Sequence, residues 1–245
     1  MTKPPGSHAI RRHLLRELRA VADPNKAPQQ QAYMKSEMPY LGVVMPVQRK
    51  IARAVFKAHP LPDPASWRHV VLEIWRNAKF REERYSAMEL AGSSAYHQWL
   101  TMDAMPMLDE LIVTGAWWDY VDTIAINLVG HILAANRSHL TPEMTRWARD
   151  DDLWRRRTSI LAQLKFKART DEALLFYAIE SSMDSSEFFL RKAIGWALRE
   201  YSKTHPTVVA RYIGKHDQQL SPLSKREGLK VLSKKGQVQP VATPQ

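Results

Sequence analysis

Apolar residues recur at helical spacing along most of the chain. Trp67, Val70, Val71, Ile74 and Trp75 are one example, because residues three and four apart share one face of a helix. No stretch alternates apolar and polar residues for long enough to make a convincing strand. The pattern therefore predicts an all-α protein.

Turn residues divide this pattern into about a dozen short helices. The segment HPLPDP at residues 59–64 is a clear stop, since proline interrupts helices and favours turns. Two later helices have a capping residue followed by proline at the expected first position, Thr141–Pro142 and Ser221–Pro222. The expected helices cover residues 10–21, 28–37, 46–58, 67–75, 80–91, 104–113, 117–135, 142–149, 151–166, 171–182, 186–203, 206–213 and 222–232.

Three residues in these helices follow one another in steps of 39: Trp118, Arg157 and Trp196. Helix pairs with a period close to 40 are typical of HEAT-like or armadillo-like solenoids, in which each pair packs only on its neighbours. Equal positions in successive repeats point to the same side of the molecule. The spacing thus predicts that the three side chains lie on one side of such a solenoid, which has a single concave surface. Asp122 joins them, because it lies one helical turn after Trp118.

The charge balance favours a polyanionic partner. The 245 residues include 36 Lys and Arg against 25 Asp and Glu, a formal net charge of +11. Nucleic acid is the first candidate for such a surplus, and an anionic membrane surface is the second. The N-terminus has no apolar core of signal-peptide type, and no run of 18 apolar residues occurs. We therefore expect a soluble, cytoplasmic protein.

The residue types exclude several chemistries. Without cysteine there is no disulfide, thiolate metal site or cysteine nucleophile. The sequence has no glycine-rich phosphate loop, no Gly-x-Ser-x-Gly elbow and no histidine pair at metal-ligand spacing. Neither a metal nor a cofactor is expected.

After these exclusions one candidate site remains, formed by Asp122 with Trp118, Arg157 and Trp196. A carboxylate between two indole faces suits a cation, because aromatic rings attract positive charge. Purines alkylated at ring nitrogen 3 or 7 are cationic, and breaking their glycosidic bond leaves a sugar with oxocarbenium character. A carboxylate can stabilise that charge and orient the attacking water, while an arginine holds a backbone phosphate.

Each residue also has a plainer interpretation. The tryptophans could be core residues, and Asp122 could cap a helix or pair with a neighbouring basic residue. Asp119 could be the carboxylate that matters. Arg157, with Arg155 and Arg156, could belong to an ordinary solvated run of charge.

Four stretches closely resemble the AlkD family of DNA alkylation repair glycosylases: WWDYVDTIA (117–125), LWRRRTSILAQLKFK (153–167), SSEFFLRKAIGWALREYSKTHP (185–206) and LSPLSKREGLK (220–230). The resemblance runs from about Gln29 to Leu232 and includes YLGVVMP at 40–46. It implies a HEAT-like solenoid that cradles duplex DNA and removes 7-methylguanine and 3-methyladenine without flipping the base. By this resemblance Asp122 is the catalytic carboxylate, Trp118 and Trp196 contact the deoxyribose, and Arg157 grips the DNA.

The expected organisation is a basic N-terminal extension with a short helix at 1–24, a glycosylase domain at 25–232 and a disordered tail at 233–245. The expected partner is duplex DNA with alkylated bases, bound by a monomer that needs no membrane and no protein partner. A HEAT-repeat scaffold that binds DNA or protein without catalysis is the main alternative, and an RNA-binding repeat protein is a weaker one. The sequence leaves open which of the two lesions is preferred and whether bulky adducts are accepted.

Overall fold

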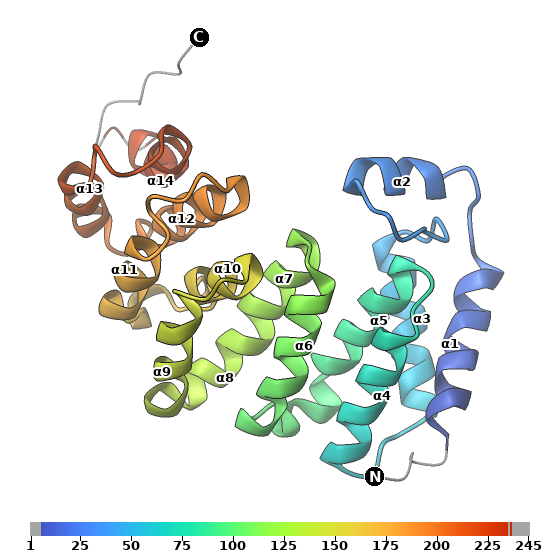
Figure 1. Ribbon diagram of the computed structural model, residues 1–245. Helices are drawn as coiled ribbons and strands as arrows, with labels where there is room; N and C mark the ends of the chain where they lie inside the picture. Colours follow the sequence, from blue (N-terminus) through green and yellow to red (C-terminus); the bar gives the residue numbers. More distant parts are fainter. Residues whose placement is uncertain (1–5, 235, 237–245) are drawn as a thin grey trace. The chain divides into compact units, whose positions relative to one another are not determined.

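The structure is a computed structural model that describes residues 6–234 and residue 236. These residues form helices, turns and loops and include no β-strand, which confirms the predicted all-α fold (Figure 1). The chain divides into two compact units, Met1–Met107 and Leu108–Gln245. The candidate site residues all belong to the second unit.

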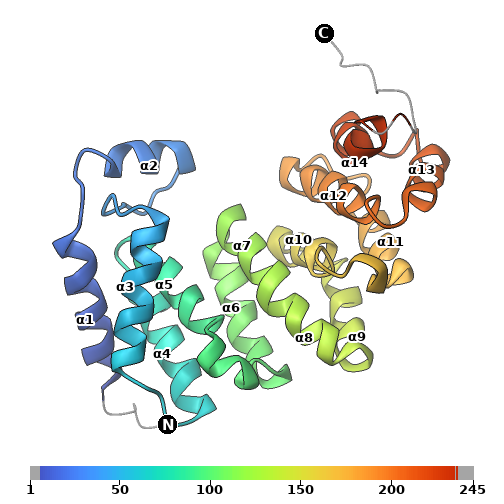
Figure 2. The same cartoon turned by 180° about the vertical axis from the view of Figure 1, so that it is seen from behind.

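Between residues 6 and 104, the first unit holds five α-helices and two short 3₁₀ helices. Its α-helices are α1 (Ser7–Ala20), α2 (Ala27–Met34), α3 (Met45–Ala58), α4 (Pro64–Arg76) and α5 (Arg81–Ala91), and the 3₁₀ helices are Ser94–Trp99 and Met102–Ala104. Figure 2 shows α1 beside α3. Ile10, Leu14 and Leu18 of α1 are buried, so the helix predicted within the N-terminal extension is part of the packing of this unit.

A buried carboxylate organises the loop before α3. Glu82 of α5 is fully buried and accepts hydrogen bonds from the consecutive backbone N–H groups of Leu41, Gly42 and Val43, at 3.0 to 3.1 Å. Gly42 has φ +85°, and a Cβ there would lie 2.0 Å from the carbonyl oxygen of Asp23. Only glycine fits at this position, so the conformation of the loop is fixed by Gly42 and Glu82 together.

The described residues of the second unit are also mainly helical. Its α-helices are α6 (Met105–Gly115, most of whose length lies in this unit), α7 (Trp118–Ile124), α8 (Gly130–Ala135), α9 (Arg137–Trp147), α10 (Leu153–Leu161), α11 (Glu172–Glu180), α12 (Phe188–Tyr201), α13 (Pro206–Lys215) and α14 (Pro222–Lys234). A π-helical segment, Ala125–Val129, joins α7 to α8, and Lys167–Arg169 form a 3₁₀ turn.

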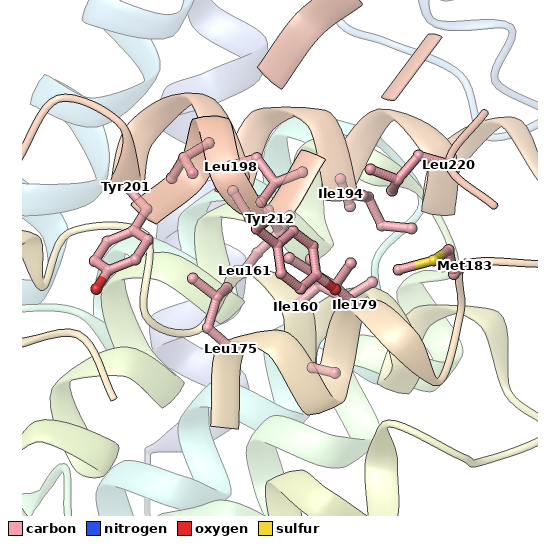
Figure 3. Close-up of a cluster of buried hydrophobic side chains, with 14 of the residues drawn as sticks. Ile160, Leu161, Leu175, Ile179, Met183, Ile194, Leu198, Tyr201, Tyr212 and Leu220 are labelled. Atoms are coloured by element: carbon pink, nitrogen blue, oxygen red, sulfur yellow. The ribbon is translucent and has the colours of Figure 1, made fainter. Parts of the chain in front are cut away.

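Apolar side chains from α10 to α13 form one continuous core in this unit. Figure 3 shows Ile160 and Leu161 of α10 together with Leu175 and Ile179 of α11, Ile194 and Leu198 of α12, and Tyr212 of α13. Burial of this surface removes apolar area from water and is the main source of stability of the array. The core fixes α10 and α12 as neighbours, and these two helices supply part of the candidate site.

Most predicted helices are present, and some boundaries were wrong. Ser221 caps α14 as predicted, since its hydroxyl accepts the N–H of Ser224 at 3.0 Å. Pro142 does not start a helix, because α9 already begins at Arg137 and Leu140 donates its N–H to Asn136 at 2.9 Å. The α10 helix ends at Leu161, short of residue 166, in a run of turns. The predicted disordered tail lies mostly outside the described residues, although α14 reaches Lys234.

Candidate active site

Three neighbouring helices of the second unit bring the predicted site residues together. Trp118 and Asp122 come from α7, Arg157 from α10 and Trp196 from α12. All four line a single pocket of about 450 Å³. The step of 39 residues therefore corresponds to real proximity, as expected for equal positions in successive repeats.

Asp122 and Arg157 form a bidentate ion pair inside this pocket. Arg157 donates from Nε to Oδ1 of Asp122 at 2.7 Å and from Nη2 to Oδ2 at 2.8 Å. The side chain of Asp122 is 13% exposed and that of Arg157 is 4% exposed. Two parallel hydrogen bonds from a guanidinium to a carboxylate fix the orientation of both groups and also place opposite charges together.

Burial sets the protonation behaviour of this carboxyl group. It raises the pKa of Asp122 above the ordinary value, because a desolvated carboxylate is disfavoured. The hydrogen bonds and the positive charge of Arg157 act in the opposite direction. The ionised form of Asp122 thus depends on Arg157.

An aromatic layer behind the pair holds Arg157 in place. The guanidinium donates its remaining Nη1 to the backbone carbonyl of Phe189 and lies 5.9 Å from the centre of the Phe189 ring. That ring packs against Trp117 and Trp154, with centroids 5.5 and 5.2 Å away. Asp152 starts α10 by accepting the N–H groups of Trp154 and Arg155, each at 2.9 Å. Arg157 is therefore directed toward Asp122 by the layer and by the capped start of its helix.

The helix that carries Asp122 changes its winding directly after the site. Residues Ala125–Val129 are π-helical, a feature that is rare and occurs often at functional sites. Immediately beyond it, a Cβ on Gly130 would lie 2.5 Å from the carbonyl oxygen of Ala162. Glycine thus permits a close approach between this helix and the end of α10. The sequence periodicity predicted one helix over 117–135 and did not indicate the π segment.

The plainer interpretations describe the geometry only in part. Asp122 does pair with a basic residue, Arg157, and Trp196 packs partly against the core. Trp118 and Trp196 are partly exposed in the pocket, whereas Trp67, Trp75 and Trp147 are core residues. Asp119 is not among the residues that line the pocket. The three arginines do not form a solvated run, because each has its own partner: Arg155 binds Asp109 at 2.8 Å through two nitrogens, and Arg156 binds the carbonyl of Ser181 at 3.1 Å.

Several residues of the pocket were not anticipated from the sequence. Phe188, Phe189, Lys192 and Arg199 come from α12, and Glu227 and Lys230 come from α14. Lys192 and Arg199 could have been found, because they lie four residues before and three after Trp196 and so share its helix face. Glu227 has no such signal, since no repeat spacing connects it to the other residues.

Two further kinds of site are absent from the part of the chain that the structure describes. No cluster of three or more His, Asp or Glu side chains there could hold a metal ion. Within the same residues, no helix is both long and apolar enough to cross a bilayer.

The fold and the pocket define a class: an all-α helical-repeat protein with aromatic, cationic and carboxylate side chains around one pocket. The chain belongs to the DNA alkylation repair enzyme family, whose model matches residues 14–232. It is also similar to the solved structure of a predicted DNA alkylation repair enzyme from Enterococcus faecalis, with 30% sequence identity and a TM-score of 0.78. That similarity covers 87% of this chain and 97% of the other. The search of curated proteins gave no match.

Proposed function

We propose that the protein is a DNA glycosylase that hydrolyses the N-glycosidic bond of positively charged alkylpurines, such as 7-methylguanine and 3-methyladenine, in duplex DNA. Membership of the DNA alkylation repair enzyme family supports a repair role. The finer assignment rests on one observation, the Asp122 carboxylate held by Arg157 in one pocket with Trp118, Trp196 and several cationic side chains.

The pocket suits a deoxyribose that develops positive charge. Two indoles and a carboxylate stabilise a cation, and the effect grows as water is excluded. Lys192, Arg199 and Lys230 line the same pocket and offer positive charge to the adjoining phosphates. The sugar-phosphate backbone is therefore the part of the lesion that these residues recognise. This mode of recognition does not require the base to be flipped into a pocket.

The reaction needs no acid on the leaving group. When the C1′–N bond breaks, its electron pair passes to the alkylated purine and neutralises the positive charge of the ring. Asp122 stabilises the cationic C1′ and orients a water, whose oxygen forms the new bond to C1′. The proton of that water passes to the carboxylate or to solvent, and the products are a free base and an abasic site.

In this mechanism Arg157 acts mainly through Asp122. Its two hydrogen bonds orient the carboxylate and favour the ionised form. Each carboxylate oxygen has two acceptor positions, so one on each oxygen remains for water or sugar. Because one chain supplies every group named, we propose that the protein works as a monomer on DNA inside the cell.

Product analysis tests this function against the non-catalytic alternative. The wild-type protein is incubated with a duplex oligonucleotide that carries one 7-methylguanine, and free base and abasic sites are both quantified. We expect equimolar release of base and formation of abasic sites, with no release from single-stranded RNA carrying the same base. Tight duplex binding without either product would contradict the proposal and favour a scaffold.

A further inference from the structure

Glu227 connects the two helices on one side of the pocket. Its carboxylate accepts a hydrogen bond from Lys192 Nζ at 2.9 Å and another from Arg199 Nη1 at 2.7 Å. Both cations belong to α12, whereas Glu227 belongs to α14. The Glu227 side chain is 12% exposed, and the side chains of Lys192 and Arg199 are 42% and 24% exposed. Glu227 is thus largely enclosed, and its two partners reach toward solvent.

The contact depends on the close packing of α14 on α12. A Cβ on Gly195 would lie 2.6 Å from Cβ of Glu227, so a side chain at residue 195 would push the two helices apart. Ser224, one turn before Glu227, donates its hydroxyl to the carbonyl of Arg191 at 2.9 Å. Both features pack α14 on the face of α12 that carries Arg191 and Gly195, which is next to the face that carries Trp196.

This arrangement sets the local charge. Lys192, Trp196 and Arg199 lie at spacings of four and three, so the indole stands between the two cations on one helix face. One carboxylate against two cations leaves a net charge of +1 on the triad of Lys192, Glu227 and Arg199. Without Glu227, Lys192 and Arg199 would lose their common anchor, and Arg199 would keep only the longer contact with Glu200 at 3.8 Å.

We propose that Glu227 is a positioning residue for the excision reaction. It fixes Lys192 and Arg199 on either side of Trp196, so that they bind the backbone phosphates beside the lesion in one register. It also limits how strongly the pocket binds any duplex, damaged or not. The inference rests on the proposed function, because the phosphates concerned are those next to the sugar that contacts Asp122.

The role of Glu227 predicts opposite effects on binding and on reaction. Glu227→Gln keeps the shape of the side chain and removes its charge, so about one more positive charge is available to phosphates. We expect undamaged duplex to bind about tenfold tighter at low salt. In a plot of the logarithm of the association constant against the logarithm of salt concentration, the slope should become more negative by about 0.9. The single-turnover excision rate should fall about tenfold, because Lys192 and Arg199 lose their common anchor and hold the lesion less accurately against Asp122.

Two further variants separate positioning from structural support. Glu227→Asp retains the charge on a shorter arm and should keep the wild-type salt dependence while recovering part of the excision rate. Glu143→Gln is the matched control, since Glu143 pairs with Arg146 at 3.1 Å on α9 and does not line the pocket. It removes the same charge and should leave excision unchanged.

The outcomes are distinguishable from a failure of the proposed function. Glu227→Gln could lower only the unfolding temperature and leave the salt dependence of duplex binding and the excision rate per folded molecule unchanged. In that case Glu227 only stabilises the packing of α14 on α12, and the inference is wrong. Equal tightening in Glu143→Gln would also overturn it, because the effect would then come from total charge. If the wild type releases no base, the proposed glycosylase activity fails, whereas the salt dependence still shows whether Glu227 governs phosphate contacts.

Discussion

Glu82 in the first unit and Asp122 in the second are both carboxylates with little exposure to solvent, and they are held in different ways. Glu82 is surrounded by protein and accepts three consecutive backbone N–H groups of the loop before α3. Asp122 is bound by one arginine and lies at the wall of a pocket. In both groups burial raises the pKa. A raised pKa therefore does not separate the two carboxylates, and our proposal for Asp122 rests on its remaining acceptor positions and its place in the pocket.

The largest effect is expected for Asp122→Asn. The amide keeps the size of the side chain but cannot stabilise a cationic sugar. We predict a fall in the single-turnover excision rate of roughly 10²-fold or more. Affinity for duplex DNA should stay close to that of the wild type in a fluorescence anisotropy titration. An excision rate that remained unchanged would move the chemistry away from Asp122.

A smaller loss, roughly 30-fold at neutral pH, is expected for Arg157→Ala, because the carboxylate loses its orientation. The pH dependence gives a sharper test. In the proposed mechanism activity requires ionised Asp122, so activity is present above the pKa of this group and lost as the pH falls through it. Burial raises that pKa, and Arg157 opposes the rise. The acidic limb of the rate profile should therefore move to higher pH in Arg157→Ala, and a limb that stays in place would show that Arg157 acts elsewhere.

The indole faces should contribute less than the ion pair. Trp196→Leu retains apolar bulk and removes the ring, and a cation–π contact of about 0.5 to 2 kcal/mol corresponds to a loss of about 2- to 30-fold in excision rate. Trp147→Phe is the control, since Trp147 is buried on α9 outside the pocket. It should lower the unfolding temperature and leave the excision rate per folded molecule unchanged. Equal losses in both variants would assign Trp196 to packing.

The smallest effect on excision is expected for Glu82→Gln. This change replaces one acceptor oxygen by a donor next to the N–H of Leu41 and should cost about 1 to 3 kcal/mol of stability. The midpoint of thermal unfolding should fall by several degrees. Excision per folded molecule should remain within about twofold of the wild type. A large loss of excision at an unchanged midpoint would mean that the two carboxylates do not differ as proposed.

The sequence predicted the features that depend on local periodicity and on equal spacing. Helical spacing of apolar residues gave the all-α fold, and the step of 39 brought Trp118, Arg157 and Trp196 into one pocket. The bidentate contact of Arg157 with Asp122 could not be predicted, because it depends on the distance between two helices. The same reason applies to Glu227, whose partners lie on another helix. Pro142 was misplaced because α9 accommodates a proline after its first turn, although local rules favour proline at a helix start.

The most direct test measures both carboxylates in one experiment. Wild type, Asp122→Asn and Glu82→Gln are each saturated with a duplex that contains one 7-methylguanine, and release of the base is followed in a single turnover at 25 °C and neutral pH. We predict release by the wild type and by Glu82→Gln at similar rates, and a rate at least about 10²-fold lower for Asp122→Asn with full binding. Release by Asp122→Asn at the wild-type rate would contradict the assignment of Asp122 as the catalytic carboxylate.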